Sequence, residues 1–321
     1  MDATIVEVNT RILDIPTIRP HKMSVATMHC QSIVLVRIKT SDGIEGIGEA
    51  TTIGGLNYGG ESPESIKTNI DSYFAPLIVG QSATKLAALR KLINKTIKDN
   101  RFAKCAIETA LYDAYAKRLG VPLNALFGGV VANEIKVAWT LASGDTQKDI
   151  AEAEQMLETR RHNIFKLKIG MRSPKDDIKH IAAIRKAVGD DVSIRVDINQ
   201  GWSETQTVQN LRALADVGVE LVEQPIHEKN LAGMQRLTAL GIVPIMADES
   251  LKGPEDGFTL ASQHCANVFA IKIEQAGGLQ HARDLIGIAQ AADIALYGGT
   301  MLEGSIATIA AAHLFATLNN L

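Results

Sequence analysis

The sequence predicts an α/β protein of two parts, a small α+β capping domain followed by a (β/α) TIM-type barrel. The first part mixes extended and helical patterns, whereas from about residue 131 apolar strand patterns alternate regularly with helical ones. The 321 residues are enough for one small and one large domain. We place the capping domain at residues 1–128 and the barrel at residues 129–321.

The strands of the first domain are indicated by alternating apolar residues. Residues 3–16 read as one strand, and residues 32–51 as a hairpin that turns at Ser41-Asp42-Gly43. Between them, residues 17–31 form a polar loop that carries His21 and Lys22.

Two helices complete this domain. The glycine-rich residues 51–65 end in the sequence SPES, which is a helix N-cap for residues 66–78. Residues 102–119 have the period of an amphipathic helix, and Gly120 ends it.

The second domain contains seven strand candidates, and each gap between them has room for one helix. The candidates are residues 135–142, 163–170, 192–200, 219–225, 243–250, 268–278 and 294–304. Repeated strand–helix units with apolar strands form a parallel sheet with helices outside it. Seven such units in series favour a barrel over an open doubly wound sheet. The glycine-rich dinucleotide fingerprint and the P-loop pattern are both absent from the sequence.

Composition excludes several classes of function. The net charge is -3 and there is no long basic run, so neither nucleic acid nor an anionic membrane is an expected partner. Cys30, Cys105 and Cys265 are widely spaced and form no CxxC pattern, which indicates free thiols in a reducing compartment and no zinc site. The N-terminus lacks the layout of a signal peptide, and no apolar run is long enough to span a membrane. We therefore expect a cytoplasmic protein.

Ionisable residues end four successive strands of the predicted barrel. Asp197, Glu223, Asp248 and Lys272 follow one another at intervals of 26, 25 and 24 residues, one strand–helix unit each. In a parallel barrel these strand ends converge at one mouth, where barrel enzymes have their sites. A lone carboxylate at a strand end is more often a helix cap or a surface ion pair. Three together favour a hard divalent ion such as Mg²⁺ or Mn²⁺.

The segment FKLKIG places Lys166 and Lys168 on the same face of one strand. On its own, this pattern is typical of an edge strand whose lysines face water. Beside a dication, however, a lysine loses stability as ammonium, and its pKa falls towards that of a general base. A divalent ion also stabilises the enolate that forms when the α-carbon of a carboxylate loses a proton. Lys168 and Lys272 would then approach that carbon from opposite faces.

The segments KLK, VDINQ, VEQP, ADES and IKIEQAGG resemble the muconate-lactonizing branch of the enolase superfamily. The resemblance covers essentially the whole chain, because RPHKMSVATMHCQ, TTIGGLNYGG and LYGGTMLEG also match this branch. It implies an enolase-like fold and the reversible lactonisation of cis,cis-muconate to muconolactone through an enolate, in catechol breakdown. Other expected possibilities are a chloromuconate cycloisomerase, an o-succinylbenzoate synthase, a dipeptide epimerase or a non-catalytic binding module.

The resemblance also implies roles for individual residues. Asp197, Glu223 and Asp248 would bind the metal, with Mn²⁺ expected and Mg²⁺ possible. Lys168 would be the acid/base, Lys166 would lower its pKa, and Lys272 would act on the opposite face. Loop residues that would shape specificity are His21, Lys22, Ile53 and Tyr58. Polar neighbours of the site would be Asn199, Glu249 and Gln275.

Members of this branch run on to an eighth barrel strand with a glutamate, and then to a segment that returns to the capping domain. Here only seven barrel strands are identifiable before Leu321, so we expect either an incomplete chain, which we favour, or a barrel with an open edge. Glu303, which ends the seventh strand, is not the eighth-strand acid. The family also forms oligomers, and we expect a homo-oligomer on that ground.

Overall fold

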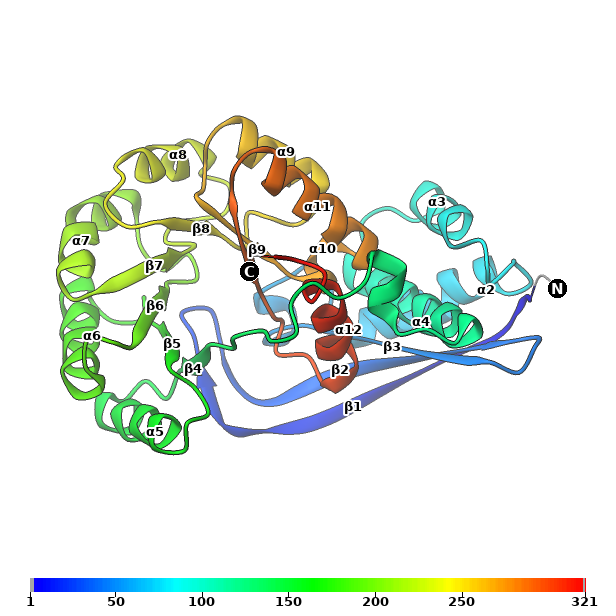
Figure 1. The fold of residues 1–321 in the computed structure, drawn as a ribbon, viewed down its shortest axis with the longest axis horizontal. Coiled ribbons are helices and arrows are strands. Elements are labelled where there is room, and N and C mark those ends of the chain that lie inside the picture. The colour runs from blue at the N-terminus through cyan, green and yellow to red at the C-terminus, as the bar shows by residue number, and fades with distance from the viewer. Residues whose placement is uncertain (1–2, 320) are drawn as a thin grey trace.

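The computed structural model describes residues 3–319 and 321, and within them the chain forms two sheets. A three-stranded antiparallel sheet has the order β1-β2-β3. A seven-stranded parallel sheet has the order β10-β9-β8-β7-β6-β5-β4 and curls into part of a barrel (Figure 1). The predicted fold class is therefore confirmed, with β4 and β10 as the edge strands of the parallel sheet in the described residues.

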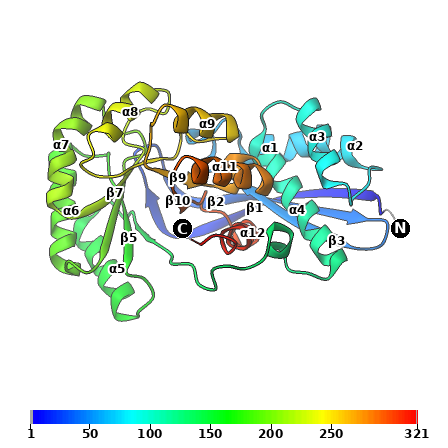
Figure 2. The ribbon, with the colours of Figure 1, turned by 45° about the horizontal axis from the view of Figure 1, so that its top comes forward.

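The capping domain packs its helices on one side of the antiparallel sheet (Figure 2). Its strands are β1 (Ile5–Lys22), β2 (Thr27–Thr40) and β3 (Glu45–Thr51). Its helices are α1 (Pro63–Asn69), a π-helical turn (Ile70–Phe74), α2 (Ala75–Ile78), α3 (Leu86–Thr96) and α4 (Arg101–Leu119). Ser62 caps α1 as SPES predicts, because its side chain accepts from the amide of Ser65. Helix α3 was not predicted from the sequence.

Helix α4 lies directly on β3, and two glycines make this close approach possible. A Cβ atom at Gly46 would lie 1.9 Å from the carbonyl oxygen of Ala110, and one at Gly48 would lie 2.0 Å from that of Ala106. Any side chain at these positions would separate the helix from the sheet.

The prediction of a long polar loop over residues 17–31 was wrong. β1 continues to Lys22 and β2 begins at Thr27, so only four residues connect them. The pairing of β1 with β2 is irregular between Pro16 and His21, and the tip then reaches the barrel, where the amide of Lys22 donates to the carbonyl of Ala142 at 2.9 Å. The tip of this hairpin is held partly by contacts with the other domain. A local sequence pattern contains no information on such contacts, so it indicated a loop. In Figure 1 this long hairpin (blue) runs beneath the barrel strands.

In the barrel, helices cover the outer face of the parallel strands (Figures 1 and 2). The strands are β4 (Trp139–Leu141), β5 (Ile164–Lys168), β6 (Ser193–Asp197), β7 (Val219–Glu223), β8 (Ile245–Ala247), β9 (Val268–Ile271) and β10 (Ala295–Gly298). The helices are α5 (Thr146–Glu158), α6 (Pro174–Val188), α7 (Glu204–Asp216), α8 (Leu231–Ala239), α9 (Pro254–Ser262), α10 (Ile273–Ala276), α11 (Leu279–Ala291) and α12 (Ser305–Phe315). No helix in the described residues is long and apolar enough to cross a membrane.

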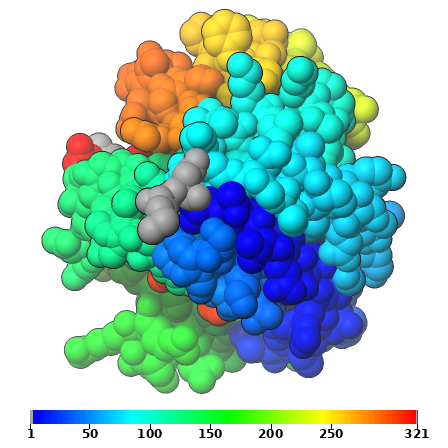
Figure 3. All heavy atoms as spheres, turned by 90° about the vertical axis from the view of Figure 1, so that its right-hand side faces the viewer, coloured from blue at the N-terminus to red at the C-terminus, as the bar shows by residue number. Residues whose placement is uncertain are grey.

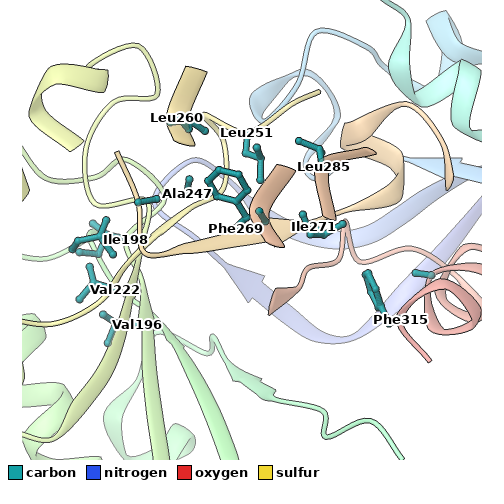
Figure 4. Close-up of a cluster of buried hydrophobic side chains, with 14 of the residues drawn as sticks. Val196, Ile198, Val222, Ala247, Leu251, Leu260, Phe269, Ile271, Leu285 and Phe315 are labelled. Carbon is teal, nitrogen blue, oxygen red and sulfur yellow. The ribbon is translucent and has the colours of Figure 1, made fainter. Parts of the chain in front are cut away.

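The core of the barrel lies between the strands and the outer helices. Val196, Val222 and Phe269 point outward from their strands and are fully buried, and Leu260 of α9 and Leu285 of α11 lie near Phe269 in the same hydrophobic cluster (Figure 4). Because side chains alternate along a strand, the residues next to them point into the barrel. The hydrophobic core therefore fixes which strand-end residues face the mouth.

A carboxylate of the capping domain joins the two domains. Glu49 of β3 is 1% exposed and accepts hydrogen bonds from the amides of Gly304, Ile306 and Ala307 at the N-terminus of α12. A carboxylate at this end of a helix satisfies free amides and interacts favourably with the helix dipole. Figure 3 shows the cap side of the molecule, with barrel segments (yellow and orange) packed directly against the cap (blue and cyan).

Candidate active site

Three carboxylates converge at the C-terminal ends of the central barrel strands. Asp197 and Glu223 are paired residues at the ends of β6 and β7, and Asp248 directly follows β8. One oxygen atom from each of the three lies within 4.8 Å of the others, and each residue is 1% exposed. The structure thus brings together the three acids that the sequence placed at one mouth.

Lys166 and Lys168 lie on β5, which is paired with strands on both sides. The edge-strand interpretation of FKLKIG therefore does not hold, and both ammonium groups face the barrel interior. Lys272 follows β9, on the other side of the three acidic strands.

Each of the three lysines donates a hydrogen bond to a different one of the three carboxylates. The lysines are largely buried, and the strands that carry them flank those that carry the acids. The pairs are Lys168 Nζ to Asp197 Oδ2 at 2.5 Å, Lys166 Nζ to Glu223 Oε2 at 3.0 Å, and Lys272 Nζ to Asp248 Oδ2 at 2.7 Å.

The capping domain closes this site from above. His21, Ile53 and Tyr58 line a small cavity together with the three lysines, Asp197 and Glu223. Lys22, in contrast, is not part of the lining, and its side chain lies against Gly144. Three of the four predicted loop residues therefore reach the cavity.

Tyr58 contacts the charged groups directly. Its hydroxyl donates to Asp248 Oδ2 at 2.7 Å and accepts from Lys272 Nζ at 2.8 Å. The Lys272 ammonium also lies 4.8 Å from the centre of the Tyr58 ring, within the distance of a cation–π contact. Tyr58 therefore orients a strand-end pair as well as lining the cavity.

The three predicted polar neighbours are buried beside the charged residues, and Asn199 also lines the cavity. Asn199, which has a φ of +43°, accepts from Lys168 Nζ at 2.9 Å and donates to Glu249 Oε1 at 3.1 Å. Gln275 donates to the carbonyls of Asp248 and Leu251, both at 2.7 Å. These bonds fix the direction of the Lys168 ammonium and the position of the loop after β8.

Comparison with known proteins places this geometry in a family. Residues 5–128 match the model of the mandelate racemase / muconate lactonizing enzyme N-terminal domain, and residues 148–321 match that of the enolase C-terminal domain-like family. The chain belongs to the mandelate racemase / muconate lactonizing enzyme family.

Within this family the chain is similar to muconate cycloisomerase 1-2 of Acinetobacter lwoffii, with 56% identity over 98% of this chain and 82% of the relative. It is also similar to a chloromuconate cycloisomerase of Pseudomonas putida, with 46% identity over 97% of this chain and 84% of the relative. Among solved structures, the muconate lactonizing enzyme from Pseudomonas fluorescens complexed with muconolactone has a TM-score of 0.98 and 54% identity. That match covers 100% of this chain and 86% of the solved one.

The surroundings of the carboxyl groups shift the pKa values of Glu223 and Asp197 in opposite directions. Burial, together with the Asp197 charge, raises the pKa of Glu223 to about 7. Burial also opposes the charge of Asp197, but the Lys168 and Lys166 ammoniums outweigh it and lower the pKa of that carboxyl. Burial and the neighbouring Lys168 lower the pKa of His21 to about 3, so its imidazole is neutral at pH 7.

The neighbouring carboxylates raise the pKa values of two of the lysines. Burial disfavours the Lys166 ammonium, but Glu223 and other neighbours raise the pKa of Lys166 well above its usual value. Likewise, burial opposes the charge of Lys272, while Asp248 and Glu223 raise its pKa. Among the protein's own charges the carboxylates dominate. A divalent cation would add positive charge to this set, so a lowered lysine pKa stays a prediction for the metal complex.

The donor set fits a hard divalent cation. Asp197, Glu223 and Asp248 supply only oxygen atoms, converge within 4.8 Å, and form the one such group in the described part of the chain. Carboxylate oxygens are the ligands that Mg²⁺ and Mn²⁺ prefer. Three buried carboxylates repel one another, so a cation among them would be strongly favoured.

Gln224, which lies within the VEQP segment, is a residue of the site that was not predicted from the sequence. Its side-chain oxygen accepts from the amides of Asp248 and Ser250 and from the Ser250 hydroxyl. Its φ of +32° places this side chain under the next strand end. The only indication in the sequence is its position next to the predicted ligand Glu223, and that position does not show where an uncharged side chain will bond.

Proposed function

We propose that this chain is a muconate cycloisomerase, which interconverts cis,cis-muconate and muconolactone. The observation that carries this proposal is the arrangement of three buried carboxylates between Lys168 and Lys272, in a chain that is 54–56% identical to four curated muconate cycloisomerases. Identity to the chloromuconate cycloisomerases is lower, at 45–46%. Chloromuconate cycloisomerase is therefore the second candidate, and the same assay compares the two.

Asp197, Glu223 and Asp248 would hold the divalent metal, and we propose Mn²⁺ as the ion. When bound, it stabilises negative charge that develops on a carboxylate of the substrate. Gln224 and Gln275 keep the Asp248 segment in place, because both bond to the loop after β8.

Lys168 is proposed as the residue that transfers the proton. One carboxylate oxygen of muconate adds to a carbon–carbon double bond of the same molecule, which forms the lactone C–O bond and leaves an enolate. The Lys168 ammonium gives its proton to the α-carbon of that enolate, and Lys168 is left neutral. In the reverse direction neutral Lys168 removes this proton and the C–O bond breaks. The bond from Lys168 to Asn199 orients the ammonium for both directions.

Lys166 and Lys272 are proposed to act electrostatically. Lys166 lies on the same strand as Lys168 and adds positive charge beside it, which favours release of the Lys168 proton. Lys272 lies on the other side of the acids, where its charge stabilises the enolate from the opposite face.

The cap residues are proposed to select the substrate. Neutral His21, Ile53 and Tyr58 line the cavity and exclude water from the reacting carbons. Lys22 lies outside this lining and would act only on the approach to the cavity. We also propose a cytoplasmic homo-oligomer whose two domains meet at residues 128 and 129.

The proposal is tested with purified protein, Mn²⁺ and cis,cis-muconate, followed by the loss of ultraviolet absorbance of the diene. Wild-type protein should consume muconate and form muconolactone, and a chlorinated muconate should react more slowly. Lys168→Ala should abolish turnover while Mn²⁺ binding persists, whereas Lys179→Ala, at a side chain that is 66% exposed, should behave as wild type. Binding of muconate without turnover in the wild type would instead indicate a binding module. Wild-type turnover by Lys168→Ala would refute the mechanism.

A further inference from the structure

Tyr297 lies inside the barrel, one side-chain layer below the metal ligands. It belongs to β10 and packs with a small inner cluster of Leu221, Met246 and Ala270, which point inward from β7, β8 and β9. None of the roles described above involves this tyrosine.

Two cations lie against the Tyr297 ring. The Lys166 ammonium is 5.4 Å from the ring centre, and the Arg195 guanidinium carbon is 5.3 Å from it. Lys166 and Arg195 are direct neighbours in the pairing of β5 with β6, so their charges repel each other inside the barrel. An aromatic face within about 6 Å stabilises a cation, because the ring quadrupole is negative there.

Arg195 depends on the ring more than Lys166 does. Within the described residues no carboxylate lies within ion-pair distance of Arg195, whereas Lys166 has Glu223 at 3.0 Å and Asp197 at 3.9 Å. Without the ring, the Arg195 charge would have nothing in this layer to offset it and would compete with Lys166 for the same acids.

We propose that the aromatic ring of Tyr297 is a positioning element for Lys166. It holds Arg195 in the lower layer and keeps the Lys166 ammonium on Glu223, beside Lys168. The ring and not the hydroxyl is responsible, because the Tyr297 hydroxyl makes no hydrogen bond in the part of the chain that the structure describes. The kinetic consequence rests on the proposed function, but the placement of Lys166 does not.

A purely structural role makes a different prediction. If Tyr297 only fills space beside Leu221, Met246 and Ala270, an apolar side chain should replace it. Tyr297→Phe keeps the ring, whereas Tyr297→Leu keeps an apolar contact and removes the ring. Trifluorinated phenylalanine at position 297 keeps the ring shape but removes its negative face, and so tests the idea even if Tyr297→Leu folds poorly.

The first measurement is a set of crystal structures of the Mn²⁺-loaded protein. Wild type and Tyr297→Phe should place the Lys166 ammonium identically, and Tyr297→Leu and the fluorinated variant should displace it or Arg195. Unchanged positions of both cations in these two variants would overturn the proposal, whatever the protein does with muconate.

The second measurement is turnover of cis,cis-muconate. Tyr297→Leu and the fluorinated variant should lower kcat by about threefold to thirtyfold with KM little changed, and Tyr297→Phe should restore kcat. Tyr297→Leu should have no further effect in a Lys166→Met background, because its action passes through that lysine. An equal loss in both backgrounds would contradict the proposal. Tyr73→Leu, at a tyrosine that is 63% exposed, is the matched control and should change neither kcat nor KM.

Discussion

Replacing Glu49 by glutamine tests how the capping domain is attached to the barrel. The carboxylate of Glu49 accepts from Gly304 through one oxygen, and from Ile306 and Ala307 through the other at 3.2 and 3.3 Å. Glutamine has the same shape but only one acceptor oxygen. Whichever way the amide is turned, its NH₂ group faces at least one amide of α12 that can only donate.

The expected cost follows from these contacts. A hydrogen bond to a charged group contributes about 1.5–3 kcal/mol, and a buried donor without an acceptor costs about 1–3 kcal/mol. Because Glu49 is 1% exposed, water cannot replace the lost acceptor. We therefore expect Glu49→Gln to lower the free energy of unfolding by about 2–4 kcal/mol.

Urea unfolding at pH 8, followed by circular dichroism, measures this difference. The matched control is Glu45→Gln on the same strand, where the side chain is 42% exposed and lies 3.7 Å from Arg37. An exposed pair of this kind contributes less than about 1 kcal/mol. Equal stability of the two variants would refute the argument that Glu49 holds α12.

Three further predictions concern single groups. Burial raises the pKa of Glu108 to about 8, whereas its value in the unfolded chain is near 4.5, so between these pH values the folded state keeps a proton that the unfolded chain releases. The free energy of unfolding should therefore fall as pH rises through this range. Urea titrations at pH 5 and pH 8 measure this fall, and Glu108→Gln should make it smaller. Tyr58→Phe removes the bonds to Asp248 and Lys272 and should lower kcat/KM for muconate by about tenfold or more, whereas an unchanged value would show that these bonds do not orient the site. Asp248→Asn should weaken Mn²⁺ binding by at least about tenfold in calorimetry, while Lys168→Ala should retain it.

The strand-end residues could be predicted because a parallel barrel has a simple geometry. Once residues 192–200, 219–225 and 243–250 are taken as consecutive parallel strands, their C-terminal ends must meet, and so must Asp197, Glu223 and Asp248. The alternation of FKLKIG likewise placed both lysines on one face. These predictions needed only backbone geometry and the identity of the end residue.

Other features depend on contacts that no local pattern contains. β1 runs through the predicted loop to Lys22 because its tip is held by the barrel, at Ala142. Tyr297 reads as an ordinary strand aromatic, and only the folded sheet places it beside Lys166 and Arg195. The roles of Ile53 and Tyr58 came from the family resemblance, since nothing in a glycine-rich loop indicates which side chain will enter a cavity in another domain.

The three lysine–carboxylate pairs at the barrel mouth have a consequence for product exchange. The three pairs sum to zero formal charge, a divalent ion adds two positive charges, and dianionic muconate restores neutrality. In the proposed mechanism, proton transfer from Lys168 keeps the complex neutral, because the lactone has one carboxylate fewer and Lys168 has lost its charge. Once solvent returns a proton to Lys168, one buried positive charge is left unbalanced, which is unfavourable in a dry cavity. A second dianion removes this imbalance when it replaces the lactone, so we expect the charge balance to favour dicarboxylates over monocarboxylates and substrate over product.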